Sequence, residues 1–411
     1  MRRWPLLHNR DYTLLWSGQS LSELGSQTSM VAYPLLILAL TGSAAKAGVV
    51  GLAKWLPLAV FALPAGALAD RLDRKRLMIA TDAIRLAAAA SIVVALWLGE
   101  PPYLQVVLVA FLDGAMFTVS HITERGALGQ VVPADQVEDA VAQNEARYFA
   151  ASIVGPPLGG LLFSVAEVLP FLADAVSFWC SMIATSLTWT RFQIGAAKPG
   201  IRASFTEGFS WLTRQPFFRT ASLVFAFGNP VYTGLYLLAK HYGASSPAVG
   251  AMFAIVGAGG VLGAIIAGPI RRHLSSRAVI AGNEWLLLTS VLLLLVVHNA
   301  LLIGVLVAVA EFGTPSGNSL VAGSRVAVTP DPLQGRVAAV SAMIAMSLGW
   351  LGPLAVGYAF EHTGPTATIL IVGGWAIGLA VAATLAPALR HGPPPRAAPV
   401  TSLPDVQPDL R

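Results

Sequence analysis

Charge is scarce in this chain: only 11% of its 411 residues are Asp, Glu, Lys or Arg, whereas soluble domains carry about 25%. Cysteine is scarcer still, because Cys180 is the only one. A single cysteine excludes a disulfide framework and a cysteine-based metal cluster. The seven histidines are scattered between apolar runs, without an i, i+4 pair of plausible ligands, so we expect no metal site.

Several functional patterns are missing as well. No G-x-x-x-x-G-K-[ST] sequence occurs, which argues against an ATP-driven pump. No nucleophile constellation is apparent, so we expect neither an enzyme nor a cofactor. Basic patches interleaved with aromatic residues are absent, and nucleic acid is therefore not an expected partner despite a net charge of +5.

What the chain has in abundance is apolar sequence. Hydrophobic residues make up 55% of it, and a membrane-spanning helix needs about 20 of them in succession. Runs of this kind predict twelve spans: 12–40, 47–69, 77–98, 102–123, 142–166, 169–190, 217–240, 246–270, 278–298, 299–322, 337–361 and 364–388. The lipid bilayer is thus an expected partner, and the predicted fold is an all-α membrane protein.

Basic residues fall on one side of these spans. Arg2, the cluster between positions 71 and 76, and the later arginines share one side, while the other receives little beyond Lys46 and Lys240. Because cytoplasmic loops are enriched in Lys and Arg, both termini are predicted to be cytoplasmic in a multi-pass protein of the cell membrane.

The two halves of the chain resemble each other. "VVPADQVEDAVAQNEARYFAASIVGPPLGG" (131–160) aligns with "VTPDPLQGRVAAVSAMIAMSLGWLGPLAVG" (328–357), and "GPIRRHLSSR" (268–277) repeats the charged turn of 66–76. This predicts a six-helix half over 1–190, a cytoplasmic linker over 191–216, and a second half over 217–388. The linker is expected to form an amphipathic helix on the membrane surface, and the proline-rich tail, 389–411, to be disordered.

"GALADRLDRKRL" (66–77) resembles the signature of major facilitator transporters between their second and third helices. Stretches 9–27, 81–85 and 169–179 further resemble the macrolide-efflux and enterobactin-exporter branch, and "GPPLGG" (155–160) the fifth-helix antiporter signature. The resemblance implies export of a small amphipathic molecule, such as a drug or a siderophore, by proton antiport and by alternating access. One chain holds both halves, so a monomer is expected to function; a symporter that imports a metabolite is the alternative.

Three groups of residues are the candidate functional sites. A cytoplasmic latch that favours the outward-open state is predicted at Gly66, Asp70, Arg71, Arg74, Lys75, Asp82 and Arg85. The antiporter motif contributes Gly155, Pro156, Gly159 and Gly160. The proton-coupling and substrate cavity is predicted at Glu23, Asp113 and Glu311, with Asn229 and Tyr232 at a kink.

The cavity prediction rests on depth. Ionisable groups in the bilayer centre are costly and usually functional, and the three acids lie about halfway along the first, fourth and tenth spans. Burial favours the neutral form of a carboxyl group, so such acids can carry a proton. With no obvious arginine in the cavity, a cationic or neutral substrate is expected. Lys54, Arg147, Asp174 and Glu284 are expected nearer the interfaces, as snorkelling or structurally paired groups.

Overall fold

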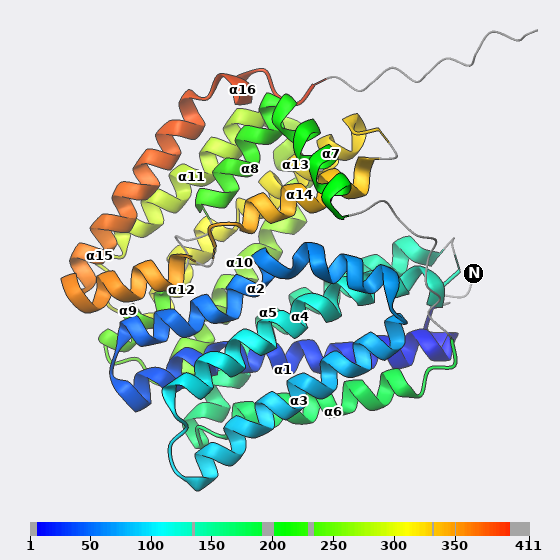
Figure 1. Cartoon of the computed structure of the whole chain (residues 1–411). Coiled ribbons are helices and arrows are strands. Elements are labelled where there is room, and N and C mark those ends of the chain that lie inside the picture. Colours follow the sequence, from blue (N-terminus) through cyan, green and yellow to red (C-terminus); the bar gives the residue numbers. More distant parts are fainter. Residues whose placement is uncertain are drawn as a thin grey trace, which may run out of the picture.

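The computed structural model describes residues 6–133, 136–190, 201–228, 234–330, 333–349 and 351–394, and in these ranges every regular element is a helix (Figure 1). A short 3-10 helix, η1 (Leu6–His8), precedes the first half. The first half contains α1 (Arg10–Thr41), α2 (Ala44–Arg71), α3 (Arg74–Leu98), α4 (Tyr103–Val131), α5 (Val137–Val165) and α6 (Leu169–Ser186). The remainder contains α7 (Ile201–Arg214), α8 (Pro216–Gly228), α9 (Leu235–His241), α10 (Ser246–His273), α11 (Ser276–Leu293), α12 (Ala300–Glu311), α13 (Thr314–Val328), α14 (Gln334–Met346), α15 (Leu351–Leu385) and α16 (Pro387–Arg390).

The internal repeat is visible in the helix starts. Helices α2 and α10 have the same length of 28 residues, and each begins after a serine, Ser43 or Ser245, whose hydroxyl accepts a backbone N–H of the first turn. Helices α3 and α11 begin after Asp73 and Ser275, which cap in the same way. A side-chain acceptor at this position satisfies donors that the helix itself leaves unpaired. Side-chain capping therefore fixes the starts of the corresponding helices in both halves.

Several helices of the second half are interrupted. Helices α8 and α9 lie in the predicted span 217–240, of which 229–233 are outside the described residues. Helices α12 and α13 meet at Phe312 and Gly313 within the predicted span 299–322. Gly364, with a φ of 80°, turns the chain inside α15 and separates the last two predicted spans. Each of the twelve predicted runs contains helical residues, and nine helices in the described residues are long and apolar enough to cross a membrane. The twelve-helix count itself stays a prediction.

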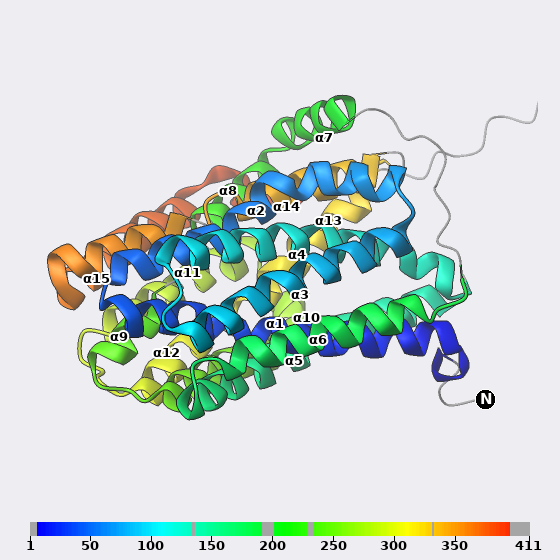
Figure 2. The ribbon, with the colours of Figure 1, turned by 60° about the horizontal axis from the view of Figure 1, so that its bottom comes forward.

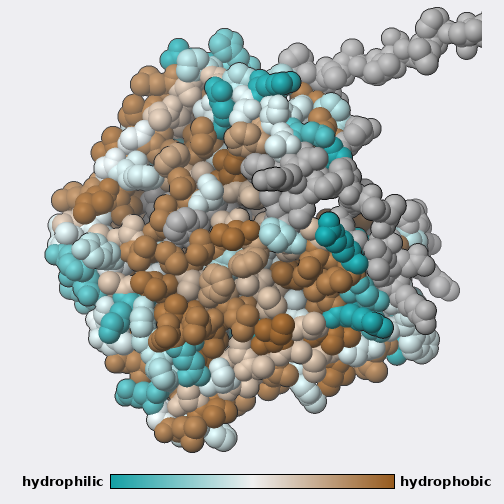
Figure 3. Space-filling view, in the orientation of Figure 1, coloured by the Kyte–Doolittle hydropathy of each residue, from teal (hydrophilic) through white to brown (hydrophobic). Residues whose placement is uncertain are grey.

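The two halves lie side by side. The helices of the first half run across the view of Figure 1, whereas α8, α11 and α15 of the second half are steeply inclined to them. We call the end that carries Leu6, the α2–α3 turn and Arg390 the basic end, and the opposite end the far end. Contacts between the halves run chiefly from α2 to α15 and from α5 to α10. Apolar side chains cover much of the face in Figure 3, as expected for a surface in contact with lipid.

Glycines bring the halves together at the far end. A Cβ built on Gly48 would lie 2.3 Å from the carbonyl oxygen of Pro353, and one on Gly250 would lie 2.4 Å from that of Pro156. Glycine alone allows this close approach of helix backbones in a membrane. Nearby, Glu361 of α15 accepts hydrogen bonds from Ser43 Oγ at 2.5 Å and from the Ala45 amide at 2.8 Å. The far end is therefore closed by backbone packing and by a carboxylate at the start of α2.

Helix α7 lies where the linker helix was predicted, and it packs on the bundle. Glu207 forms an ion pair with Arg336 of α14, and Trp211 stacks on Phe218 with ring centroids 5.6 Å apart. Leu212 is buried in the same apolar cluster. Figure 2 shows α7 crossing over the second half. At the other end of the chain, Leu389, which the sequence places in the tail, is buried, while 395–411 lie outside the described residues.

Candidate functional site

The first half contains a buried charge centre built around Asp113 of α4. Its Oδ1 accepts a hydrogen bond from Arg85 Nε at 2.7 Å, and its Oδ2 pairs with Lys54 Nζ. Arg85 and Asp113 are each only 2% exposed. One carboxylate thus joins α2, α3 and α4, and two cations share it.

Arg85 has further partners that hold it in place. Its guanidinium donates to Ser26 Oγ of α1 at 2.7 Å and lies 4.0 Å from the ring centroid of Phe178 on α6. Asp174 of α6 interacts electrostatically with Asp113, Arg85 and Lys54. Together with Ser177 it leaves no room for a side chain at Gly25. Two acids and two cations therefore lie together in the core of this half.

This group corrects one expectation from the sequence. The cavity prediction assumed acids without an arginine near them, but Arg85 and Lys54 both reach Asp113. Lys54 is also deeper than expected. Helix α2 begins at Ala44, so at a rise of about 1.5 Å per residue Lys54 lies about 15 Å from its far end. The argument for a cationic substrate from unpaired acids is therefore lost for Asp113.

Other buried polar contacts of this half lie closer to its basic end. Glu124 forms an ion pair with Arg147 at 2.8 Å, which agrees with the structural pairing expected for Arg147. Glu23 accepts a hydrogen bond from Gln27 Nε2 at 2.9 Å within α1. Asp82, which lies on α3 like Arg85, accepts a hydrogen bond from Ser181 Oγ of α6 at 2.7 Å. The first half thus places most of its buried acids beside a cation or a hydrogen-bond donor.

The predicted latch residues lie in two places. Gly66, Asp70 and Arg71 are in the last turns of α2 at the basic end, although the Asp70 side chain lies outside what the structure describes. Arg74 donates to the carbonyls of Ala69 and Gly126, and Lys75 donates to that of Thr188. These bonds stay within the first half. Asp82 and Arg85 lie deeper along α3, in the buried contacts described above.

The residues of "GPPLGG" pack α5 between two neighbours. A Cβ on Gly155 would lie 2.4 Å from Gln27 Cβ, and one on Gly159 would lie 2.3 Å from the Thr28 carbonyl oxygen, so both face α1. Gly160 and Pro156 face the other half. A Cβ on Gly160 would lie 2.2 Å from the carbonyl oxygen of Ser246 at the start of α10. The motif therefore joins the two halves near the far end.

The second half carries the remaining acid of the cavity prediction. Glu311 is the last residue of α12, beside the break at Gly313. Asn229 and Tyr232 lie between α8 and α9, outside the described residues. The charge centre around Asp113 and the Glu311 region belong to different halves, and the structure does not bring these residues into one group.

Comparisons with known proteins now place the chain. The profile of a family described as transmembrane secretion effector matches residues 2–406. The chain belongs to this family of the major facilitator superfamily. The multidrug efflux pump Tap of Mycolicibacterium fortuitum is 30% identical over 420 residues, which cover 95% of this chain and 97% of that protein. Macrolide efflux protein A of Streptococcus pyogenes is 31% identical over 163 residues, which cover 39% of this chain and 40% of that protein.

Solved structures support the fold. A bacterial homologue of the human lysosomal transporter Spinster, inward-facing and unoccupied, matches with a TM-score of 0.73 at 15% identity, covering 95% of this chain and 99% of the other. The nucleoside transporter NupG matches with a TM-score of 0.73 at 13% identity, covering 91% and 98%. The resemblance found in the charged turn is confirmed: this is a multi-pass membrane transporter with the major facilitator fold and not an enzyme.

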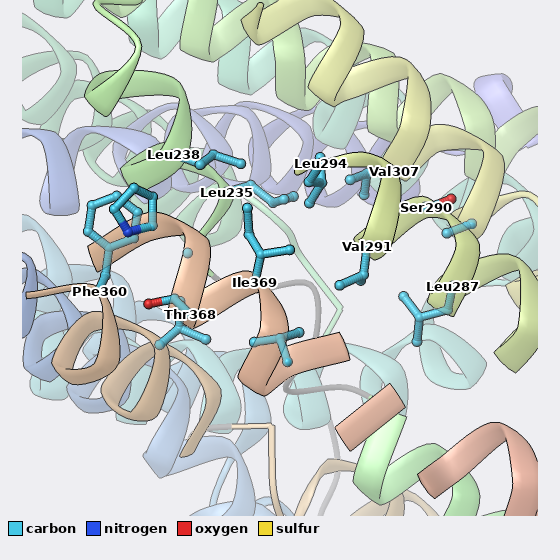
Figure 4. A pocket seen from close by; sticks show the side chains of 15 residues that line it. Leu235, Leu238, Leu287, Ser290, Val291, Leu294, Val307, Phe360, Thr368 and Ile369 are labelled. Atoms are coloured by element: carbon cyan, nitrogen blue, oxygen red, sulfur yellow. The ribbon is translucent and has the colours of Figure 1, made fainter. Parts of the chain in front are cut away.

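An apolar cavity lies inside the second half of this transporter (Figure 4). Its walls come from α9, α11, α12 and α15, and Leu235, Val291 and Ile369 meet at its centre. The free space is about 50 Å³, whereas sites for drug-sized ligands measure about 300–1,000 Å³. This cavity is therefore too small to hold a substrate of that size in the present conformation.

Proposed function

We propose that this transporter exports a small amphipathic molecule in exchange for protons by alternating access. The observation that carries the proposal is the position of Asp113 between Lys54 and Arg85. Protonating a carboxylate removes its attraction for both cations at once. Because an unpaired buried charge is strongly unfavourable, the helices that carry the cations would then rearrange. A proton on Asp113 is in this way a switch for the packing of α2, α3 and α4.

The relatives support the direction of transport and the substrate class. Tap is named a multidrug efflux pump, and the streptococcal relative is named a macrolide efflux protein. We infer that the substrate of this transporter is likewise a drug-like or macrolide-like molecule. Lys54 and Arg85 already pair with Asp113, so a neutral or weakly basic substrate fits this half better than a multiply charged cation.

Alternating access requires contacts that open and close at each end. At the far end the halves are held by Gly48, Gly160 and Glu361. At the basic end we propose that Asp70, with the arginines of the α2–α3 turn, forms the latch that closes after the far end has opened. In the present conformation Arg74 and Lys75 donate to carbonyl groups of their own half.

The function predicts that efflux depends on the proton gradient. Energised cells that carry the transporter and are loaded with the fluorescent cation ethidium should lose it faster than cells that carry an empty vector. A protonophore should abolish the difference, and fluorescence decay measures it. Energised accumulation of the compound by the wild-type transporter would instead identify a symporter and refute export.

The orientation gives a separate prediction. With the basic end in the cytoplasm, both termini are cytoplasmic, and the Arg-rich turn between α2 and α3 is on the same side. A reporter that fluoresces only in the cytoplasm should therefore fluoresce when fused after Arg411. A dark fusion, together with an active periplasmic reporter at the same site, would contradict the orientation and the even number of spans.

A further inference from the structure

Helices α3 and α11 occupy the same place in the two halves, and each carries one buried acid at the same position. Counted from their caps, Asp73 and Ser275, the residues at this position are Asp82 and Glu284. Both are buried, with exposed fractions of 0% and 3%. The surroundings of the two acids are nonetheless different.

The first half supplies positive charge near its acid, and the second half does not. Asp82 has Ser181 as a donor and interacts electrostatically with Arg85 on the next turn of α3. The residue that corresponds to Arg85 in α11 is Leu287, and the residue that corresponds to Lys54 in α10 is Val256. Among the described residues Glu284 Oε2 has no hydrogen-bond partner, and the side-chain neighbour that interacts with Glu284 is Asn283.

The helices around Glu284 carry charged groups, but these groups do not lie beside its carboxyl group. The titratable residues of the described neighbouring helices are Arg219 of α8, Arg271, Arg272 and His273 of α10, Glu311 of α12, Arg325 of α13, Tyr358, Glu361 and His362 of α15, and Arg390 of α16. None of them interacts electrostatically with Glu284. In the described part of the chain, the carboxyl group of Glu284 is therefore without a counter-charge.

Glu284 faces the ends of two interrupted helices. A Cβ on Gly228, the last residue of α8, would lie 3.7 Å from Glu284 Oε2. The adjacent Asn283 places its Oδ1 against Gly313, where α12 gives way to α13. Glu284 is also eight residues from the start of α11, or about 12 Å along it, which places it near the middle of the helix.

A carboxylate at this depth without a cation would be strongly unfavourable, so the site must hold a positive ion. The described residues contain no group of three His, Cys, Asp or Glu that could hold a metal ion, whereas a proton needs only one carboxyl group. We propose that Glu284 is a proton-binding site of the second half, loaded in this conformation and emptied when the ends of α8 and α12 move. Only the coupling of this proton to transport rests on the function proposed above.

The first test is the pH dependence of stability. Glu284→Gln keeps the shape of the side chain and removes its ability to ionise. Purified wild-type protein and the variant should have the same melting temperature at pH 5, where the wild-type carboxyl is neutral. At pH 9 the wild type must ionise a buried group, so its melting temperature should fall about 2–4 °C or more below that of the variant.

The control is Glu361→Gln, because Glu361 is exposed at the far end and accepts two hydrogen bonds that favour its ionised form. This variant should not gain stability over the wild type at high pH. If Glu284→Gln differs from the wild type by the same amount at every pH from 5 to 9, the proton site is refuted.

Chemical labelling gives a second, independent readout. Dicyclohexylcarbodiimide reacts with protonated carboxyl groups in apolar surroundings, and mass spectrometry locates the adduct. Membranes treated at pH 6 should carry the adduct on Glu284, and labelling should decrease toward pH 9. Asp113, paired with two cations, should stay unlabelled in the same sample. Labelling of Asp113 but not of Glu284 would overturn the assignment.

Transport then tests the coupling alone. In liposomes, Glu284→Gln should retain exchange of ethidium across the membrane without a gradient and should lose uptake driven by an imposed pH gradient. If wild-type efflux does not respond to a protonophore, the proposed antiport fails, but the stability and labelling results still decide whether Glu284 binds a proton.

Discussion

Replacing Asp113 with Asn is expected to reduce transport driven by a pH gradient by at least about tenfold and to destabilise the protein. The amide cannot bind a proton, and it leaves Lys54 and Arg85 without the carboxylate that both contact. Breaking a buried pair from one side costs about 3–5 kcal/mol. Proteoliposomes with an imposed gradient measure the first effect, and thermal unfolding of the purified protein measures the second.

A double variant separates the two effects. Lys54→Met removes one of the two stranded cations, so Lys54→Met combined with Asp113→Asn should recover part of the lost stability. It should not recover transport driven by the gradient, because the proton-binding group is still missing. Wild-type transport rates in Asp113→Asn would show that the coupling proton binds elsewhere and would remove the main support for the proposed switch.

The sequence predicts the fold well because its strongest signals are local. Apolar runs identify the helices, and the similarity of 131–160 to 328–357 indicates the two halves. The charged turn of 66–77 and the glycines of 155–160 point to the family, which the profile match confirms. The roles that we assign to those residues remain predictions.

The contacts of the charge centre were harder to predict. The run of apolar residues suggested that the second span starts at 47, whereas the helix starts at Ala44, and this difference hides the depth of Lys54. Arg85 follows the charged turn in sequence, and this position predicts a role in the latch. Its partner Asp113 is on the next helix, and this pairing depends on how α3 and α4 face each other. Which faces of two helices contact each other cannot be read from any short stretch of the sequence.

In the second half, hydropathy does not predict where a helix is interrupted. Residues 299–322 form one apolar run, and hydropathy cannot reveal that α12 ends at Glu311. The break matters because it brings Gly313 against Asn283, next to Glu284. An acid in an apolar run is a visible signal at Glu284. The apolar run predicts a position near an interface, whereas the structure places Glu284 near the middle of α11. The missing counter-charge follows from the paired positions of the two halves, because Leu287 and Val256 stand where the first half has Arg85 and Lys54.

The second large effect is expected for Gly160→Ala in the motif that joins α5 to α10. The new methyl group would lie 2.2 Å from the Ser246 carbonyl oxygen and 3.1 Å from the Gly250 amide nitrogen, so the two helices must separate. Overpacking of this kind costs about 1–3 kcal/mol, and 1.4 kcal/mol is about a tenfold change in an equilibrium. Because this contact exists when the far end is closed, the population should shift toward an open far end, and ethidium efflux should fall.

Gly260→Ala is the matched control, since Gly260 lies inside α10 and a Cβ there meets no atom within 4 Å. Both substitutions exchange the same residues within a helix, so their effects on helix propensity cancel. Spin labels at Val165 and His241, in a variant with Cys180 replaced by Ser, report the distance between the halves at the far end. That distance should lengthen in Gly160→Ala and stay unchanged in Gly260→Ala. An unchanged distance with normal efflux in Gly160→Ala would show that this contact does not hold the far end closed.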